Sequence, residues 1–215
     1  MNKGLRSDIP KPTVARLPHY RRALEYLLST GATVISSHDL AREAEVTPSQ
    51  LRKDLAYFGQ FGTAGIGYDV RELISRLDEI LGMSLRRPVL LVGMGNLGRA
   101  VLGHLPSYRS GFEIVAAADI SEAKVGRVIS GIRCHHISEV ARLIKTHGIE
   151  IAVLTVSSEN AQEAAKSLVS AGIRAIVNFT PARLRVPESV VVEQVDLSIT
   201  LQKVSFYLEI GRAPV

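Results

Sequence analysis

The chain has 215 residues, of which 46% are hydrophobic and 22% are charged, with a formal net charge of +5 and a single cysteine, Cys134. These proportions are typical of a globular protein with one large or two small domains. No apolar run approaches the roughly 20 residues that a membrane-spanning helix needs, and the N-terminus lacks the apolar core of a secretory signal. One cysteine excludes an internal disulfide framework, so we expect a cytoplasmic protein.

Positive charge gathers at the N-terminus. Residues 1–22 contain six basic residues and one acidic residue, so this segment alone accounts for the net charge. The basic residues are Lys3, Arg6, Lys11, Arg16, Arg21 and Arg22. Such a segment suits a polyanionic partner such as nucleic acid, but a solvated basic tail explains the pattern equally well.

The first part of the chain has the periodicity of a helical domain with a glycine-rich insertion. Helices are expected over residues 13–31, 36–46, 47–59 and 69–81. The third is the best capped, because Thr47 is a typical N-cap and Pro48 suits the first helical position. The insertion, "FGQFGTAGIGYDV", is punctuated like a hairpin. This order predicts a winged helix-turn-helix whose third helix enters a DNA groove; a three-helix bundle with a charged outer face is the alternative.

The second part alternates apolar strands with helices. Strands are expected over residues 88–92, 112–120, 149–156, 173–179 and 189–195, and helices over 96–105, 137–148, 159–172 and 197–211. Continuous apolar strands that alternate with helices predict an α/β Rossmann fold, with a doubly wound and mostly parallel sheet covered on both faces. The last helix follows the last strand, so it can pack on something other than its own domain.

A glycine fingerprint lies between the first strand and helix of this part. Gly93, Gly95 and Gly98 match the G-x-G-x-x-G pattern of a dinucleotide-binding turn. Asp119 ends the next strand 21 residues after Gly98, where a carboxylate accepts hydrogen bonds from the adenine ribose. Asp119 disfavours the 2′-phosphate of NADP, and nearby Lys124 weakens that inference only slightly, so NAD(H) is expected. An empty Rossmann fold and a coenzyme A site remain alternatives.

The sequence favours a nucleotide that acts as a regulatory ligand over one that takes part in a catalysed reaction. A dehydrogenase needs a proton-transfer group beside the nicotinamide, and none of the six histidines forms a catalytic pattern with a carboxylate. We expect no substrate domain after the nucleotide domain, and a helix-turn-helix candidate precedes it. We therefore expect no enzyme. A small NAD-dependent oxidoreductase and an architectural DNA-binding protein with a vestigial nucleotide site are the competing hypotheses.

The motifs together resemble one family. "SSHDLAREAEVTPSQLRKDLAYFGQFGTAGIGYDV", "VGMGNLGRAV" and "GIRAIVNFTPARLRVPESVVVEQVDLS" are similar to the Rex family of bacterial redox-sensing transcriptional repressors, over residues 9–208. The resemblance implies a homodimer that binds palindromic double-stranded operator DNA and releases it on binding NADH, while NAD⁺ leaves it competent for DNA. It implies a winged-helix domain over 1–84, a Rossmann domain over 85–197 and a helix over 198–215 that the two subunits exchange.

The resemblance also assigns residues to roles. The expected DNA contacts are Ser49, Gln50, Arg52, Lys53, Tyr57, Thr63 and Gly65. The expected NAD(H) contacts are Gly93, Met94, Gly95, Asn96, Leu97, Gly98, Asp119, Ile120, Lys124, Thr155, Val156, Ser157, Asn178, Phe179 and Thr180. Arg22, Tyr108 and Asp196 would couple the redox state to DNA release. Two positions depart from the family pattern, which often has a basic residue beside Ala64 and a proline at Ser157. No metal site is expected.

Overall fold

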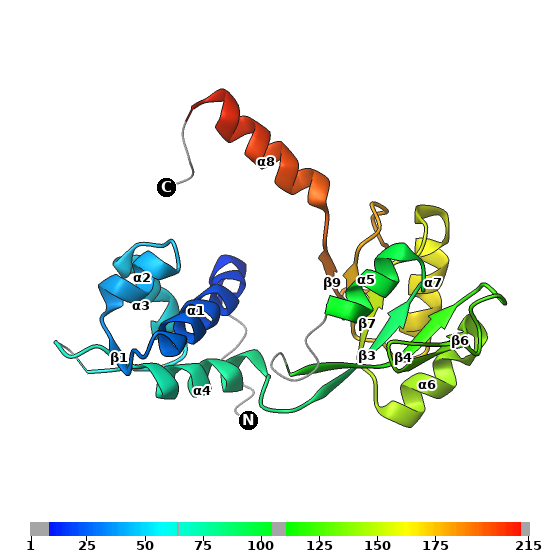
Figure 1. Cartoon of the computed structure of the whole chain (residues 1–215), viewed down its shortest axis with the longest axis horizontal. Helices are drawn as coiled ribbons and strands as arrows, with labels where there is room; N and C mark the ends of the chain where they lie inside the picture. Colours follow the sequence, from blue (N-terminus) through cyan, green and yellow to red (C-terminus); the bar gives the residue numbers. More distant parts are fainter. Residues whose placement is uncertain (1–8, 64, 105–110, 212–215) are drawn as a thin grey trace. The chain divides into compact units, whose positions relative to one another are not determined.

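The computed structural model describes residues 9–63, 65–104 and 111–211. The chain divides into two compact units between Ser84 and Leu85 (Figure 1). We call them the N-terminal unit and the C-terminal unit.

Four helices build the N-terminal unit: α1 (Lys11–Ser29), α2 (Ser37–Glu43), α3 (Pro48–Ala56) and α4 (Val70–Leu81). They share one apolar core to which every helix contributes, for example Leu24 of α1, Leu40 of α2, Leu51 of α3 and Leu77 of α4, all completely buried. The apolar spacing that predicted these helices is therefore the spacing of their core-facing residues.

The helix starts follow the expected capping chemistry. The Ser36 side chain accepts a hydrogen bond from Asp39 N, and the Thr47 side chain accepts one from Gln50 N, both at 3.1 Å. Asp69 caps α4 in the same way through Glu72 N at 2.8 Å. Each cap satisfies a backbone donor that the first helical turn leaves free. The predicted start of α3, the candidate recognition helix, is thus confirmed.

The glycine-rich insertion forms a small wing. Thr63 and Gly67 form an isolated antiparallel bridge, and β2 (Tyr68–Asp69) pairs with β1 (Val34–Ile35). A Cβ on Gly67 would lie 2.3 Å from the Ile35 carbonyl oxygen, so only glycine allows this approach. The predicted hairpin is present as the bridge between Thr63 and Gly67. The strand β1 was not predicted because two residues carry no periodic signal.

The C-terminal unit holds a seven-stranded sheet in the order β5-β6-β4-β3-β7-β8-β9. The strands are β3 (Arg87–Val92), β4 (Phe112–Asp119), β5 (Val128–Ile129), β6 (Ile132–His136), β7 (Ile151–Leu154), β8 (Ala175–Asn178) and β9 (Val191–Gln194). All neighbours pair in parallel except β5 with β6. The chain leaves β3 for β4 on one side and later returns to β7 on the other, which makes the carboxyl end of β3 a topological switch point.

Helices cover both faces of this sheet (Figure 1). Residues of α6 (Val140–His147) and α7 (Ser158–Ser170), including Leu143 and Leu168, share one apolar cluster with the sheet. Residues of α5 (Asn96–His104) pack against a second cluster that contains Leu91 and Met94. A short 3-10 helix, η1 (Ile137–Glu139), leads into α6. The predicted α/β Rossmann fold with a winged helix before it is therefore present.

The chain ends in α8 (Leu197–Glu209), none of whose residues is buried. Leu197, Leu201 and Leu208 are 76%, 67% and 76% exposed. Val204, Phe206 and Ile210 are exposed as well. A helix this apolar is ordinarily buried against something.

Candidate functional sites

A cavity of about 490 Å³ opens at the switch point, beside the turn from β3 into α5. This volume is within the range of ligand pockets. Its lining includes eight of the fifteen residues expected at the nucleotide: Gly93, Gly95, Asp119, Ile120, Lys124, Thr155, Val156 and Ser157. The glycine fingerprint, the acid at the end of β4 and the loop after β7 therefore meet around one space.

The three fingerprint glycines have three different reasons to lack a side chain. Gly93 has φ +100°, and a Cβ there would lie 2.7 Å from the Thr155 carbonyl oxygen. A Cβ on Gly98 would lie 1.9 Å from the Gly93 carbonyl oxygen, so α5 can approach the turn only without it. Gly95 has nothing within 4 Å of its missing Cβ. The space beside Gly95 is open to the cavity, as a pyrophosphate that approaches the backbone requires.

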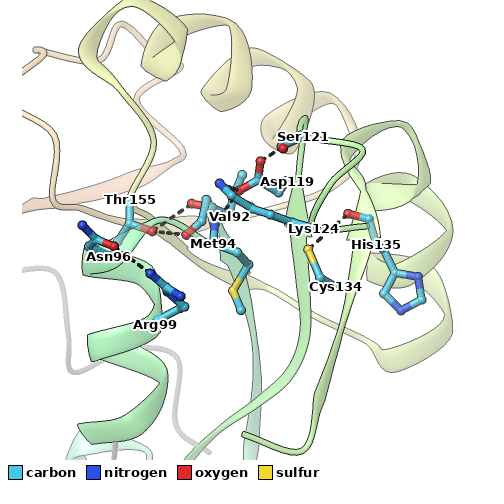
Figure 2. A network of polar contacts seen from close by, with 11 residues as sticks. Val92, Met94, Asn96, Arg99, Asp119, Ser121, Lys124, Cys134, His135 and Thr155 are labelled. Atoms are coloured by element: carbon cyan, nitrogen blue, oxygen red, sulfur yellow. Dashed lines mark hydrogen bonds and ion pairs between the residues drawn. The ribbon is translucent and has the colours of Figure 1, made fainter. Parts of the chain in front are cut away.

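Thr155 holds the fingerprint turn from the neighbouring strand. Its Oγ1 hydroxyl lies 2.7 Å from the Gly93 carbonyl oxygen and 3.2 Å from that of Val92 (Figure 2). The Thr155 backbone N–H donates to the Val92 carbonyl as well. Thr155 thus fixes the turn at the start of α5, where backbone amides and the helix dipole favour an anion.

Asp119 is the hub of the cavity's polar wall. Its Oδ2 accepts hydrogen bonds from Met94 N at 2.7 Å and Lys124 Nζ at 2.8 Å, and its Oδ1 accepts one from Ser121 N at 2.9 Å (Figure 2). The side chain is only 6% exposed. Burial raises the pKa of Asp119, but the donors Lys124, Ser121 and Met94 outweigh burial and hold the pKa below its usual range. The carboxylate is therefore charged at neutral pH.

The other seven expected nucleotide contacts do not line the cavity. The Met94 side chain is 1% exposed and packs in the core, while its backbone N–H donates to Asp119. Asn178 is buried, donates to the Ala182 carbonyl and Gln194 Oε1, and accepts from Thr180. Asn178 and Thr180 thus shape the loop after β8, while Phe179 packs beside the Met94 cluster. Asn96, Leu97 and Gly98 begin α5.

One wall of the cavity was missed by sequence reasoning. It consists of Ser121, Ile137 and four residues of α7, which are Asn160, Glu163, Ala164 and Ser167. The spacing of the α7 residues at three and four positions is the signal of a shared helix face. Nothing in the sequence distinguishes that face from an ordinary solvated one.

The N-terminal unit presents the expected DNA contacts on α3 and the wing. Ser49, Arg52 and Lys53 are exposed on α3, and Thr63 and Gly65 are exposed in the wing. Arg52, Thr63 and Gly65 line one groove of about 500 Å³, and Arg52 also donates to Ser37 Oγ at 2.9 Å. Tyr57 is half-buried at the end of α3. Cationic and hydroxyl groups on a capped helix beside a wing suit contacts to phosphates and base edges.

Gln50 differs from these residues because its amide is already engaged. Gln50 Nε2 donates to Asp54 Oδ1 at 2.9 Å. Asp54 is completely buried and also accepts from Thr13 Oγ1 at 2.9 Å, Tyr20 Oη at 2.6 Å, and Arg16 Nε and Nη2 at 2.6 and 2.8 Å. Burial raises the pKa of Asp54, but these hydrogen bonds, led by that from Arg16, hold the pKa far below its usual range. The network ties α3 to α1.

Part of the N-terminal positive charge is neutralised by ion pairs within the N-terminal unit. Arg16 pairs with Asp54, and Arg21 pairs with Glu25 and Asp78. These two arginines are therefore less available to a polyanion than the sequence suggested, whereas Arg22 is exposed. Asp196 caps α8 through Ser198 N at 2.8 Å, and Tyr108 and Ala64 lie outside the described residues.

Two protein-family models match the chain. The model described as "Putative DNA-binding protein N-terminus" matches residues 8–56, and the model described as "CoA binding domain" matches residues 86–182. The first match covers the helices up to α3, and the second covers the fingerprint and the cavity. No group of three or more metal-ligating side chains gathers in the part of the chain that the structure describes, and no helix there is long and apolar enough to span a membrane.

Curated relatives match nearly the whole chain. A protein of Maridesulfovibrio salexigens is 46% identical over 93% of this chain and 95% of its own length, and one of Syntrophobacter fumaroxidans is 41% identical over 95% and 98%. Both are named redox-sensing transcriptional repressor Rex. Among solved structures, RSP in complex with β-NAD⁺ and operator DNA has a TM-score of 0.89 and 38% identity, covering 96% of this chain and 95% of that one. RSP with β-NADH has a TM-score of 0.87 and 36% identity, covering 96% and 97%.

Proposed function

Because this chain belongs to the Rex family of redox-sensing transcriptional repressors, we propose that it represses transcription by binding operator DNA and leaves the DNA when NADH binds. The observation that carries this proposal is the presence, in one chain, of a capped helix beside a wing and of an open nucleotide cavity at a glycine fingerprint. Crystal structures of RSP with operator DNA and with either nicotinamide nucleotide support both halves.

The N-terminal unit supplies the DNA contacts in this proposal. Arg52 and Lys53 of α3 bind the operator, with Ser49 and Tyr57 on the same helix and Thr63 and Gly65 in the wing. The support is the exposure of all of these residues except the half-buried Tyr57, as well as the favourable electrostatics of cations facing phosphates. A palindromic operator follows from two copies of the unit related by a twofold axis.

The C-terminal unit supplies the nucleotide contacts. The turn at Gly93, Gly95 and Gly98 and the start of α5 would hold the pyrophosphate, while Asp119 would accept a hydrogen bond from the adenine ribose. The expected contacts at Ile120, Lys124, Val156 and Ser157 line this cavity, and Phe179 packs beside the cluster that contains Met94. The bound nucleotide supplies a redox-dependent nicotinamide charge. The protein's residues orient the nucleotide. The difference between the nucleotide's affinities for two conformations of the protein drives DNA release.

Coenzyme A is the second candidate for this cavity, because the matching family model carries its name. Its adenosine bears a 3′-phosphate, which a buried, charged Asp119 disfavours. A nucleotide with a free ribose diol suits the carboxylate better. Competition between coenzyme A and NADH distinguishes the two, because coenzyme A should not displace NADH at comparable concentrations.

We propose further that the protein acts as a homodimer in the cytoplasm. The support for a dimer is α8, whose leucine, isoleucine, valine and phenylalanine side chains are all at least 48% exposed. A second copy would cover this helix and exchange it, as expected for residues 198–215. Replacing Leu201 and Leu208 by Glu should convert a dimer to a monomer in light scattering, whereas Lys145→Glu, a charge change on α6, should leave the mass unchanged. An unchanged dimer in the double variant would contradict the role of α8.

The decisive test is fluorescence anisotropy of a labelled palindromic operator at fixed salt. The protein should bind the operator, NADH should displace it, and NAD⁺ should not. The variant R52A/K53A should lose operator affinity by at least tenfold while keeping NADH affinity. Its control, Lys145→Ala, removes a cation from the C-terminal unit and should change neither. Operator binding that ignores both nucleotides, or survives R52A/K53A, would overturn the respective half.

A further inference from the structure

The Asp119 carboxylate, although paired with Lys124, keeps one hydrogen-bond acceptor position unused. A carboxylate offers about four lone pairs. The two on Oδ2 are taken by Met94 N and Lys124 Nζ, and among the described residues Oδ1 accepts only from Ser121 N. One acceptor position therefore remains on Oδ1, while the ammonium group of Lys124 binds the other oxygen, Oδ2 (Figure 2). Lys124 is 36% exposed and lines the cavity.

A ribose diol needs more than one acceptor position. Its two hydroxyls present two donors and several acceptors, and a carboxylate with one vacancy can receive only one of the donors. Lys124 has three N–H donors, of which Asp119 takes one. A hydroxyl oxygen beside Asp119 can therefore accept from the same ammonium that fixes the carboxylate.

The pair has opposite effects on a phosphorylated ribose. Asp119 is buried and charged, so it repels a 2′-phosphate. Lys124 is half-exposed at the end of a flexible side chain, so it can turn to that phosphate. The Ser121 N–H lies on the same wall and points at the same carboxylate.

We propose that Lys124 is a specificity-determining residue, which reads the adenine ribose together with Asp119 and limits how strongly the site rejects a 2′-phosphate. This inference rests on the proposed function, because it concerns the nicotinamide nucleotide bound in that cavity. Asp119 makes the site prefer NADH, and Lys124 keeps the preference moderate. The site contains a latent 2′-phosphate position that the carboxylate suppresses.

The test measures NADH and NADPH binding separately by calorimetry, with no DNA present. In Lys124→Met, NADH affinity should fall about threefold and NADPH affinity about thirtyfold, because the cation that offsets Asp119 is gone. The preference for NADH then rises about tenfold. In Asp119→Asn, which retains an acceptor for Met94 N, NADH affinity should fall while NADPH affinity rises, so the preference shrinks or inverts. Lys145→Met, the control on α6, should change neither affinity.

The outcomes separate this inference from the proposed function. Equal losses for NADH and NADPH in Lys124→Met would overturn the role of Lys124 while leaving NADH sensing in place. A preference unchanged in Asp119→Asn would do the same for the latent phosphate position. Failure of the unmodified protein to bind NADH would instead overturn the proposed function itself.

Discussion

Among the described residues, each unit buries one aspartate, and the two carboxylates are used in opposite ways. Asp54 in the N-terminal unit is completely buried and accepts five hydrogen bonds, four from α1 and one from Gln50. Asp119 in the C-terminal unit is 6% exposed, accepts three, and keeps a vacancy on the cavity wall. A carboxylate whose acceptor positions are all used within the protein stabilises the fold. A carboxylate at a cavity with a free acceptor position can bind a ligand.

This difference explains why a lowered pKa has a structural meaning at Asp54 and a functional meaning at Asp119. The pKa of both groups lies below its usual range, and in both cases hydrogen-bond donors outweigh burial. A lowered pKa therefore marks a stabilised charge without distinguishing structure from function. The number of free acceptor positions and the adjoining cavity make that distinction.

The largest expected effect comes from the same substitution at the two aspartates. Asp54→Asn leaves Arg16 without its charged partner and removes acceptors from a buried network, so it should destabilise the N-terminal unit by about 3 kcal/mol. Asp119→Asn loses a pair with a half-exposed lysine and should cost about 1 kcal/mol or less. Peptide-resolved hydrogen exchange in denaturant measures each unit separately. Equal losses in the two units would break the comparison.

The second prediction contrasts two glycines of the fingerprint. Gly95→Ala adds a Cβ into open space and should leave the unfolding free energy nearly unchanged, while NADH affinity falls on the order of a hundredfold because the pyrophosphate needs that space. Gly98→Ala forces the Gly93 carbonyl away and should reduce stability and affinity together. Denaturant melts and NADH titration of both variants check this. If Gly95→Ala were destabilised, the space beside Gly95 would be occupied by other protein atoms and not open to a ligand.

The third prediction uses pH to isolate Asp54. Because its folded pKa is depressed, its contribution to stability is fully present above the unfolded value of about 3.9 and is lost as pH falls through the folded pKa. The stability difference between wild type and Asp54→Asn should therefore be constant above about pH 5 and shrink below about pH 4. A difference that grows as the pH falls would contradict the assignment. Denaturation at several pH values in buffers of equal ionic strength measures it.

Much of this architecture could be predicted because it depends on local chemistry. The caps at Ser36 and Thr47, the apolar strands and the fingerprint glycines each act on residues a few positions away. The sequence also placed Asp119 at the end of a strand, from which its position beside the glycine turn follows through parallel pairing.

The remaining features depend on contacts between residues far apart in the sequence. Asp54 meets Thr13, Arg16 and Tyr20 across separations of 34 to 41 residues, and no local pattern signals that meeting. The four cavity residues of α7 likewise become a wall only because β7 brings that helix beside the fingerprint. Sequence reasoning also counted Arg16 and Arg21 as free positive charge, since it could not see their acidic partners.

The smallest expected effect concerns Gln50, which the family resemblance places at the DNA. Its amide donates one of the five hydrogen bonds of Asp54, so Gln50→Met should cost about 1 kcal/mol of stability. If the amide stays with Asp54 in the complex, operator affinity should fall only slightly and equally for every operator sequence, because no base loses a partner. If the amide turns to a base, Gln50→Met should lose the preference for that one base pair. The loss should be roughly the 1–3 kcal/mol of discrimination that a bidentate contact provides. Anisotropy with a panel of single-base operator variants distinguishes these results. A uniform loss would place Gln50 with the saturated network of the N-terminal unit, and a loss confined to one position would place it among the groups kept available to a ligand.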